Sequence, residues 1–212
     1  MSTGRFIALE GGEGSGKSTQ ARLLADALAA RGIDAVLTRE PGGTPGAEAI
    51  RTLLLDPPGE GWGAQAEALL FAAARSDHVA RLIRPALAAG RWVVCDRFVD
   101  SSRAYQGGAG GVGDDAVRSL HTIGSDSLRP DLTLLIEVSP EVAASRVTAR
   151  DGDAADAIGG RDAAYHARVA AAFRAFAADD PTFAAIDGDG SPDEVHTRVL
   201  EALAPLLTQA SA

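Results

Sequence analysis

The chain contains a single lysine, Lys17, and it lies inside a glycine-rich run over residues 11–18. The remaining nineteen of its twenty Lys+Arg residues are arginines. The run fits the pattern G-x-x-x-x-G-K-[ST], which begins at Gly11 and ends at Ser18. The backbone N–H groups of such a loop point inward and form an anion site at the N-terminus of the following helix. A compact ammonium reaches the β- and γ-phosphates there, where a planar guanidinium is too bulky. The pattern therefore predicts a nucleoside triphosphate site.

The residues on either side of this loop support the prediction, because a phosphate-binding loop of this kind connects a strand to a helix. Phe6–Leu9 is a short apolar run typical of a strand, and Ser18–Leu28 has apolar residues at helical spacing. A dinucleotide fingerprint is excluded, because Gly12 and Gly14 are followed by Lys17 where G-x-G-x-x-G needs glycine. The predicted triphosphate contacts are Gly11, Gly12, Glu13, Gly14, Ser15, Gly16, Lys17, Ser18 and Thr19, with the Ser18 hydroxyl as a ligand of Mg²⁺.

Composition limits the classes of protein to which the chain can belong. Its net charge of −9 argues against binding a nucleic acid polymer, which needs a basic face. A pocket with clustered arginines can still hold a nucleotide on an acidic protein. Cys95 is the one cysteine, which excludes an internal disulfide and a cysteine-based metal site. No apolar run approaches a membrane span and no signal pattern opens the chain, so we expect a cytoplasmic protein without a membrane partner.

Strand-like and helical segments alternate along the chain, as in a parallel sheet covered by helices on both faces. After Phe6–Leu9, the strand-like runs are Ala35–Thr38, Trp92–Cys95, Leu132–Val138 and Phe183–Ile186. Helical patterns include Ala64–Ala74, His78–Ala89, Asp114–Ile123 and Pro140–Thr148. We therefore expect an α/β P-loop NTPase fold with a five-stranded parallel sheet, in a single domain over residues 1–212.

Three segments are expected to lie outside the regular elements. Asp56–Gly63 is rich in proline and glycine and indicates a loop. Gly107–Gly113 holds five glycines in seven residues, which favours a flexible hinge. Arg150–Asp162 is polar, contains glycine and suits a mobile flap between two helical patterns.

Charged residues follow the second and third predicted strands, at the edge where ligands bind in such sheets. Asp96 directly follows the third strand, and an aspartate there can hold Mg²⁺ directly or through water. Arg39, Arg97 and Arg51 could converge on a second phosphate group. Taken alone, each of these arginines is better explained as a solvated surface charge. The positions of Arg39 and Arg97 directly after consecutive strands favour a role in the site, whereas Arg51 fits either explanation.

Phe71 and Arg75 are four residues apart in one helical pattern and so share a face. An aromatic ring beside a guanidinium could stack on a base and donate to its carbonyl edge. Alternatively, Phe71 belongs to the hydrophobic core. Tyr105 and Gln106 are similarly ambiguous from their positions alone.

Taken together, these residues resemble the thymidylate kinase family over about residues 5–200. The segments that carry the resemblance are Glu10–Thr19, Thr38–Thr44, Arg51–Asp56, Phe71–Arg75, Asp96–Phe98, Ser101–Gly107, Arg129–Thr133 and Ile186–Gly188. The resemblance implies a nucleoside monophosphate kinase with a lid near residues 146–165. It implies transfer of a phosphoryl group from ATP to dTMP with Mg²⁺, and a homodimer. The closest alternative is another nucleoside monophosphate kinase. A GTP-binding switch is excluded, because D-x-x-G after the third strand and a later N-K-x-D are both missing.

The resemblance also implies a role for individual residues. Arg39, Arg51 and Arg97 would hold the thymidylate phosphate, and Phe71 would stack on the thymine. Arg75 would donate to the thymine O4, with Ser102 and Gln106 close to the base. Tyr105 would crowd the 2′ position of the sugar, Glu13 would contact the 3′-hydroxyl and Asp96 would support Mg²⁺. The implied catalytic residues are Lys17, Arg97, Arg150 and Glu13.

One position departs from the family pattern. The family carries its catalytic arginine either in the P-loop or in the lid, and the P-loop position here is Gly14, which implies the lid type. The usual Asp-Arg pair of the lid is Asp156-Ala157 in this chain. We therefore expect Arg150 to be the catalytic lid arginine, with Arg146 and Arg161 as alternatives.

Overall fold

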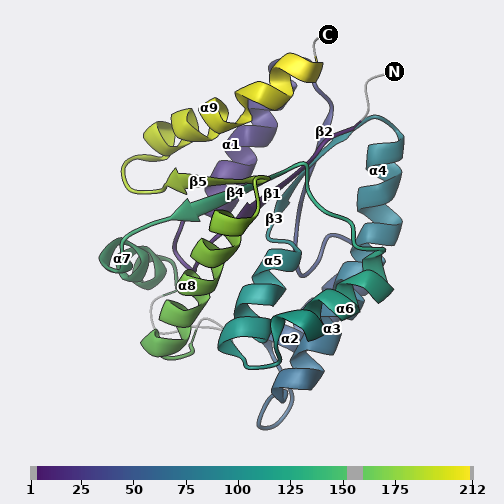
Figure 1. The fold of residues 1–212 in the computed structure, drawn as a ribbon, viewed down its shortest axis with the longest axis vertical. Coiled ribbons are helices and arrows are strands. Elements are labelled where there is room, and N and C mark those ends of the chain that lie inside the picture. The colour runs from purple at the N-terminus through teal and green to yellow at the C-terminus, as the bar shows by residue number, and fades with distance from the viewer. Residues whose placement is uncertain (1–3, 152–159, 211–212) are drawn as a thin grey trace.

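A five-stranded, all-parallel sheet forms the centre of the molecule (Figure 1). The computed structural model describes residues 4–151 and 160–210. The strands stand in the order β2-β3-β1-β4-β5. Their bounds are Phe6–Glu10 for β1, Ala35–Arg39 for β2, Trp92–Asp96 for β3, Leu132–Glu137 for β4 and Phe183–Asp187 for β5. The predicted fold class and all five predicted strands are confirmed.

The three central strands β3, β1 and β4 are mostly apolar and buried because both faces of the sheet are covered, whereas the outer strands β2 and β5 are partly exposed. Successive side chains of β1 point to opposite faces, so Ile7 and Leu9 belong to one core cluster and Phe6 and Ala8 to another. A third cluster forms around Tyr105, on the same side of β4 as Leu135. Burial on both faces accounts for the continuous apolar runs that the sequence shows.

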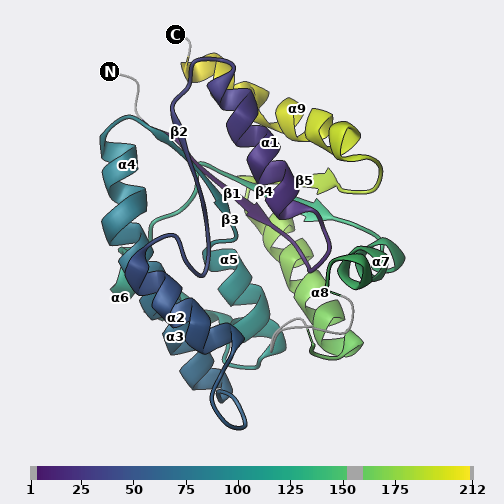
Figure 2. The ribbon, with the colours of Figure 1, turned by 180° about the vertical axis from the view of Figure 1, so that it is seen from behind.

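Helices form a layer on each side of the sheet. The helix α1 (Lys17–Ala29) and the helix α9 (Pro192–Ala210) lie together on one face (Figure 2). The opposite layer and the surrounding connections contain α2 (Pro45–Leu55), α3 (Ala64–His78), α4 (Arg84–Ala88), α5 (Val99–Ser102), α6 (Asp114–Ser125), α7 (Pro140–Asp151) and α8 (Ala163–Asp179). Two π-helical turns, η1 (Val79–Ile83) and η2 (Arg103–Ala109), directly extend α3 and α5.

The predicted loop Asp56–Gly63 is confirmed, but the hinge expected over Gly107–Gly113 is not. Its first residues are helical, because η2 runs to Ala109. The backbone N–H of Gly113 then donates to the Gly107 carbonyl, which closes the segment into a hydrogen-bonded turn. Of the predicted flap Arg150–Asp162, residues 152–159 lie outside the described residues. Within the described part of the chain, no helix is both long enough and apolar enough to cross a membrane.

Candidate functional site

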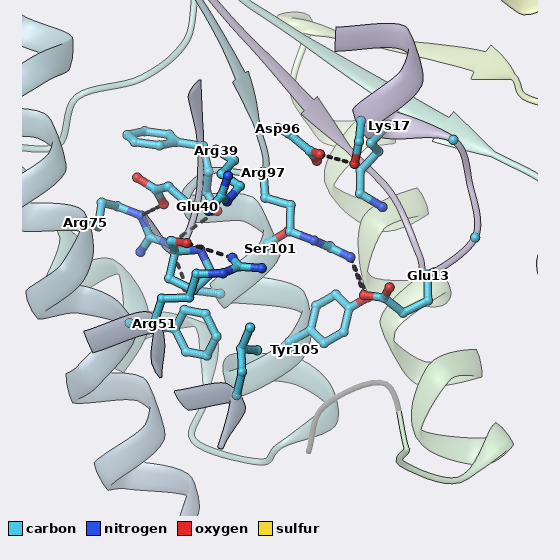
Figure 3. A pocket seen from close by; sticks show the side chains of 18 of the residues that line it. Glu13, Lys17, Arg39, Glu40, Arg51, Arg75, Asp96, Arg97, Ser101 and Tyr105 are labelled. Carbon is cyan, nitrogen blue, oxygen red and sulfur yellow. Dashed lines mark hydrogen bonds and ion pairs between the residues drawn. The ribbon is translucent and has the colours of Figure 1, made fainter. Parts of the chain in front are cut away.

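A cavity of about 760 Å³ opens at the carboxyl ends of β1, β2 and β3 (Figure 3). Lys17 and Asp96 lie at one end of it and Arg75 at the other. The predicted residues that line the cavity are Glu13, Gly14, Gly16, Lys17, Ser18, Thr19, Arg39, Arg51, Phe71, Arg75, Asp96, Arg97, Ser102, Tyr105, Gln106 and Arg146. Gly11, Gly12, Ser15 and Arg161 are not among its lining residues. The structure thus brings most of the P-loop residues and all eight predicted substrate-binding residues to one cavity.

The P-loop connects β1 to α1 and encloses the side chain of Lys17. Gly16 takes a left-handed φ of 94° directly before the helix, a conformation that favours glycine. The Lys17 Nζ donates to the Gly12 carbonyl at 2.6 Å and to the Ser15 Oγ at 3.1 Å. Burial lowers the pKa of Lys17 to about 8, and the Arg97 guanidinium acts in the same direction. The loop therefore holds a desolvated ammonium where phosphates are expected.

Ser18 and Asp96 offer the oxygen ligands that Mg²⁺ prefers. The Ser18 Oγ donates to the Asp96 Oδ2 at 2.5 Å, across the gap between α1 and the end of β3. Both residues line the cavity beside Lys17. This donor set fits a magnesium ion bound next to the phosphates of a nucleotide.

Arg97 lies between the two ends of the cavity, and its guanidinium contacts both sides. It donates to the Gly11 carbonyl at 3.1 Å and to the Glu13 carboxylate, which are P-loop groups. It also donates to the Ser101 Oγ at 3.1 Å and lies over the Tyr105 ring, 5.1 Å from the ring centroid. Its φ of 71° is unusual for a residue with a side chain. Residues with a strained backbone conformation cluster at functional sites, so the strain at Arg97 is consistent with a functional role.

Glu10 holds the turn that carries Arg97, a role that sequence reasoning missed. Its buried carboxylate accepts hydrogen bonds from the Phe98 N–H at 2.8 Å and the Ser101 N–H at 3.0 Å. It thereby caps the short helix α5, at whose N-terminus the backbone N–H groups lack the i−4 carbonyl partners of a longer helix. Burial raises the pKa of Glu10 to about 7, and the Asp100 carboxylate acts in the same direction. The only signal in the sequence was a charged residue at the end of an apolar strand.

Two arginines of the predicted phosphate site lie on the wall formed by β2 and α2. The Arg51 Nη1 donates to the Pro41 carbonyl at 2.8 Å. The Arg39 Nη2 is 3.1 Å from the Glu48 carboxylate, and the Arg39 side chain is half exposed. Both line the cavity together with Arg97, so three cations from separate elements face one space.

The far end of the cavity has the residues predicted to read a base. Phe71 lines the wall and is only partly buried, so it does not belong to the three core clusters. Arg75 is 3 % exposed, and its Nη2 donates to the Ser102 Oγ at 2.8 Å. The Gln106 side chain donates to the Glu67 carboxylate at 2.8 Å, and burial raises the pKa of Tyr105 to about 12. These polar groups are held in fixed positions around a slot beside an aromatic ring.

The arginines considered for the lid are not equivalent. The Arg150 side chain lies outside the described residues, as do Asp156 and Ala157. The Arg146 guanidinium is 3.5 Å from the Ser15 carbonyl and lines the cavity beside the P-loop. Arg161 forms an ion pair with Glu67, away from the P-loop.

Gly14 could not be replaced by arginine without moving α7. A Cβ at Gly14 would lie 2.5 Å from the Ala143 carbonyl oxygen, and the φ of 70° further disfavours a side chain.

A parallel sheet with a P-loop after its first strand and an arginine-rich acceptor pocket beyond it defines a P-loop kinase of the nucleoside monophosphate type. A family model described as thymidylate kinase matches residues 9–199. The chain therefore belongs to the thymidylate kinase family and is a nucleoside monophosphate kinase.

Individual relatives agree with this assignment. The chain is 60 % identical over 205 residues to the thymidylate kinase of Rhizorhabdus wittichii, with 96 % of this chain and 99 % of the relative covered. It is 50 % identical to that of Nitrobacter winogradskyi, covering 94 % of this chain and 88 % of the relative. A crystal structure of thymidylate kinase from Ehrlichia chaffeensis superposes with a TM-score of 0.78 at 32 % identity, covering 95 % and 99 % of the two chains.

Proposed function

We propose that the protein transfers the γ-phosphoryl group of ATP to the 5′-phosphate of dTMP, giving dTDP and ADP in the synthesis of dTTP. The observation that carries the proposal is the single cavity that joins the P-loop to three arginines and a base slot. The donor phosphates would bind at Lys17 and the acceptor phosphate at Arg39, Arg51 and Arg97.

The acceptor oxygen of a nucleoside monophosphate is already anionic, so the transfer needs no strong general base. Catalysis would come from alignment and from neutralising charge on the transferred group. Lys17 would act from the P-loop and Arg97 from between the two nucleotides. The hydrogen bonds of Arg97 to Glu13 and Ser101, which fix its guanidinium beside the P-loop, support this role.

Ser18 and Asp96 are the residues we propose for Mg²⁺, since their oxygens adjoin the P-loop. A bound Mg²⁺ would offset phosphate charge. The Ser18 hydroxyl and the Asp96 carboxylate come from separate elements. The fold brings them together before the nucleotide binds.

The base slot supports thymine as the preferred base. Arg75 would donate to the O4 of thymine. Cytosine presents an amino group at the same position, so two hydrogen-bond donors, the guanidinium and the amino group, would face each other. Gln106 and Ser102 would lie close to the base. Tyr105, which is buried and neutral, would crowd the 2′ position and disfavour a ribonucleotide.

The test of the proposed function is ADP release with ATP and Mg²⁺ across a panel of nucleoside monophosphates. We expect strong preference for dTMP over dUMP, dCMP, UMP, AMP and GMP. Preference for another monophosphate would keep the phosphate chemistry but overturn the base assignment at Phe71 and Arg75.

Replacing Phe71 with alanine should raise the KM for dTMP and leave the KM for ATP unchanged. The ring lines the cavity and is only partly buried, and a stack between a base and an aromatic ring contributes about 1–3 kcal/mol. This corresponds to roughly 5- to 150-fold in KM. Steady-state kinetics with each substrate varied in turn measure both constants, and Phe71→Leu serves as a control for volume. An unchanged KM for dTMP would assign Phe71 a purely structural role.

Arg150 is the arginine we propose for the lid, in a lid-arginine type of enzyme. The crowding of Gly14 by Ala143 supports this type, because it leaves no space for a P-loop arginine. We expect Arg150→Ala to lower kcat more than it changes either KM. The same measurement on Arg146→Ala and Arg161→Ala provides the comparison. A larger loss of kcat in either of those variants would transfer the role to that residue.

We also propose a homodimer, a cytoplasmic location and a single domain over residues 1–212 with a lid near residues 146–165. Exposed apolar side chains support the dimer, because Leu53, Leu69 and Ile123 project from the neighbouring helices α2, α3 and α6. Sedimentation equilibrium measures the oligomeric state directly.

A further inference from the structure

A buried chain of polar side chains connects β2 to the base slot. The Thr38 Oγ1 lies 2.8 Å from the His78 Nε2, and the His78 Nδ1 lies 3.0 Å from the Glu40 Oε1. The other carboxylate oxygen, Glu40 Oε2, accepts from the Arg75 Nε at 2.7 Å. His78 is completely buried and Glu40 is 5 % exposed. None of Thr38, Glu40 and His78 takes part in the proposed phosphoryl transfer.

The contact with the carboxylate favours one tautomer of the His78 ring. A carboxylate oxygen accepts hydrogen bonds, so the contact between Oε1 and Nδ1 is a hydrogen bond when the ring N–H is on Nδ1. Thr38 completes the contacts of the ring at Nε2. Each oxygen of Glu40 is therefore fixed by one nitrogen donor, and both donors lie on α3, in His78 and Arg75.

Glu40 in turn determines the orientation of the Arg75 guanidinium. The Nε of Arg75 is committed to Glu40, and its Nη2 donates to the Ser102 Oγ and to the Phe98 carbonyl. Among the described residues its Nη1 has no hydrogen-bond partner, and Arg75 lines the cavity. Because the guanidinium is planar, fixing two of its nitrogens also fixes the direction of the third.

The ring of His78 also supports the loop that follows β2. A Cβ at Gly43 would lie 2.4 Å from the Thr38 Oγ1 and 2.6 Å from the His78 Nε2, so the backbone of the loop passes directly over this pair. The same loop carries the Pro41 carbonyl that accepts from Arg51. His78 thus lies between the phosphate wall and the base slot.

We propose that His78 is a positioning residue that, through Glu40, holds Arg75 in the orientation that reads the base. The inference rests on the proposed function, because it assigns Arg75 to the base of dTMP. The rival explanation is a purely structural one, in which His78 satisfies a buried carboxylate and stabilises the fold without affecting selectivity.

Two substitutions of His78 separate these explanations, because each retains one of the two ring contacts. The side-chain amide of His78→Asn can occupy the position of Nδ1 and donate to Glu40. The longer side chain of His78→Gln extends to the position of Nε2 and retains the Thr38 contact instead. Glutamine is closer to histidine in volume, so loss of packing alone would make the asparagine variant the worse of the two.

We expect His78→Gln to raise the KM for dTMP roughly tenfold, as for the loss of a hydrogen bond to a charged group. The preference for dTMP over dCMP, measured as the ratio of kcat/KM values, should fall by a similar factor. The KM for ATP should stay within about twofold of wild type, since the P-loop is untouched. His78→Asn should resemble wild type in all three quantities. Thr38→Val, which keeps the contact between His78 and Glu40, should also retain the wild-type KM for dTMP.

Equal KM values for dTMP in wild type and the glutamine variant, together with a lowered Tm, would overturn the inference and leave a structural role. If the glutamine variant does not fold, Glu40→Gln tests the same link. There we expect a raised KM for dTMP at constant KM for ATP, and a wild-type KM for dTMP would overturn the inference. The proposed function fails separately, in the wild-type protein, if dTMP is not the preferred acceptor.

Discussion

Replacing Lys17 with methionine should reduce turnover on the order of a thousandfold or more, the effect of removing a key electrostatic group from a phosphoryl-transfer site. The Nζ lies inside the P-loop, bonded to the Gly12 carbonyl and the Ser15 hydroxyl, and no other lysine exists in the chain to replace it. Methionine approximates the length of the side chain without its charge. The affinity for dTMP should stay largely intact, because the acceptor arginines come from other elements. Rapid-quench turnover and calorimetric titration with dTMP measure the two effects separately.

Lys17→Arg should be as inactive as Lys17→Met, although it keeps a positive charge. Lys17 is only 6 % exposed, and the loop leaves no space for a planar guanidinium. Arg31→Ala is a matched control, since it removes an exposed cation just after the same helix. Thermal unfolding should show that the methionine variant is folded. Turnover close to wild type in Lys17→Met would refute the phosphate-binding role of the loop.

The lowered pKa of Lys17 supplies a second readout of the same role. The ammonium is protonated below a pH of about 8 and loses its charge above it, whereas an ordinary lysine stays charged to about 10.5. The free enzyme should therefore lose kcat/KM for ATP as the pH rises above about 8. The residual activity of Lys17→Met should not show this decline.

Replacing Arg97 with lysine should lower kcat on the order of a hundredfold, even though the charge is kept. The guanidinium contacts the Gly11 carbonyl, Glu13 and Ser101 at the same time, and an ammonium cannot match this fork of donors. We expect a larger loss in Arg97→Gln, which removes the charge as well as the ion pair with the partly buried Glu13. Single-turnover kinetics at saturating ATP and dTMP isolate the chemical step.

Arg91→Ala is the matched control for Arg97, because Arg91 directly precedes the same strand at its opposite end and pairs with Asp34 at the surface. Its kcat should be indistinguishable from that of wild type. A kcat within about threefold of wild type in Arg97→Lys would mean that Arg97 contributes charge alone.

Much of the site followed from patterns of neighbouring residues. The P-loop and β1 were recognisable because a strand, a glycine-rich run and a helix follow one another directly. Arg39, Asp96 and Arg97 were expected to converge because strands of a parallel sheet end at one edge. The structure confirms that all three line one cavity.

The connections between these residues were not predictable in the same way. Glu10 gave no sign that it caps α5, because its partners lie 88 and 91 residues further along the chain. His78 is the first residue of a predicted helix, whereas in the structure it ends α3 and contacts the Glu40 carboxylate from a fully buried position. The pairing of Arg161 with Glu67 is equally invisible in the sequence, because the two residues are 94 apart.

Local order along the chain thus determined the elements and the type of phosphate loop, since backbone conformation depends on a residue and its near neighbours. Packing determined which side chains share a cavity, which carboxylates are buried and how far the pKa of Lys17 falls. These properties depend on desolvation and on partners brought together by the sheet, as in the bond between Ser18 and Asp96 across 78 residues. The two residues of such a hydrogen bond are too far apart for any local sequence pattern to include both, so only folding brings them into contact.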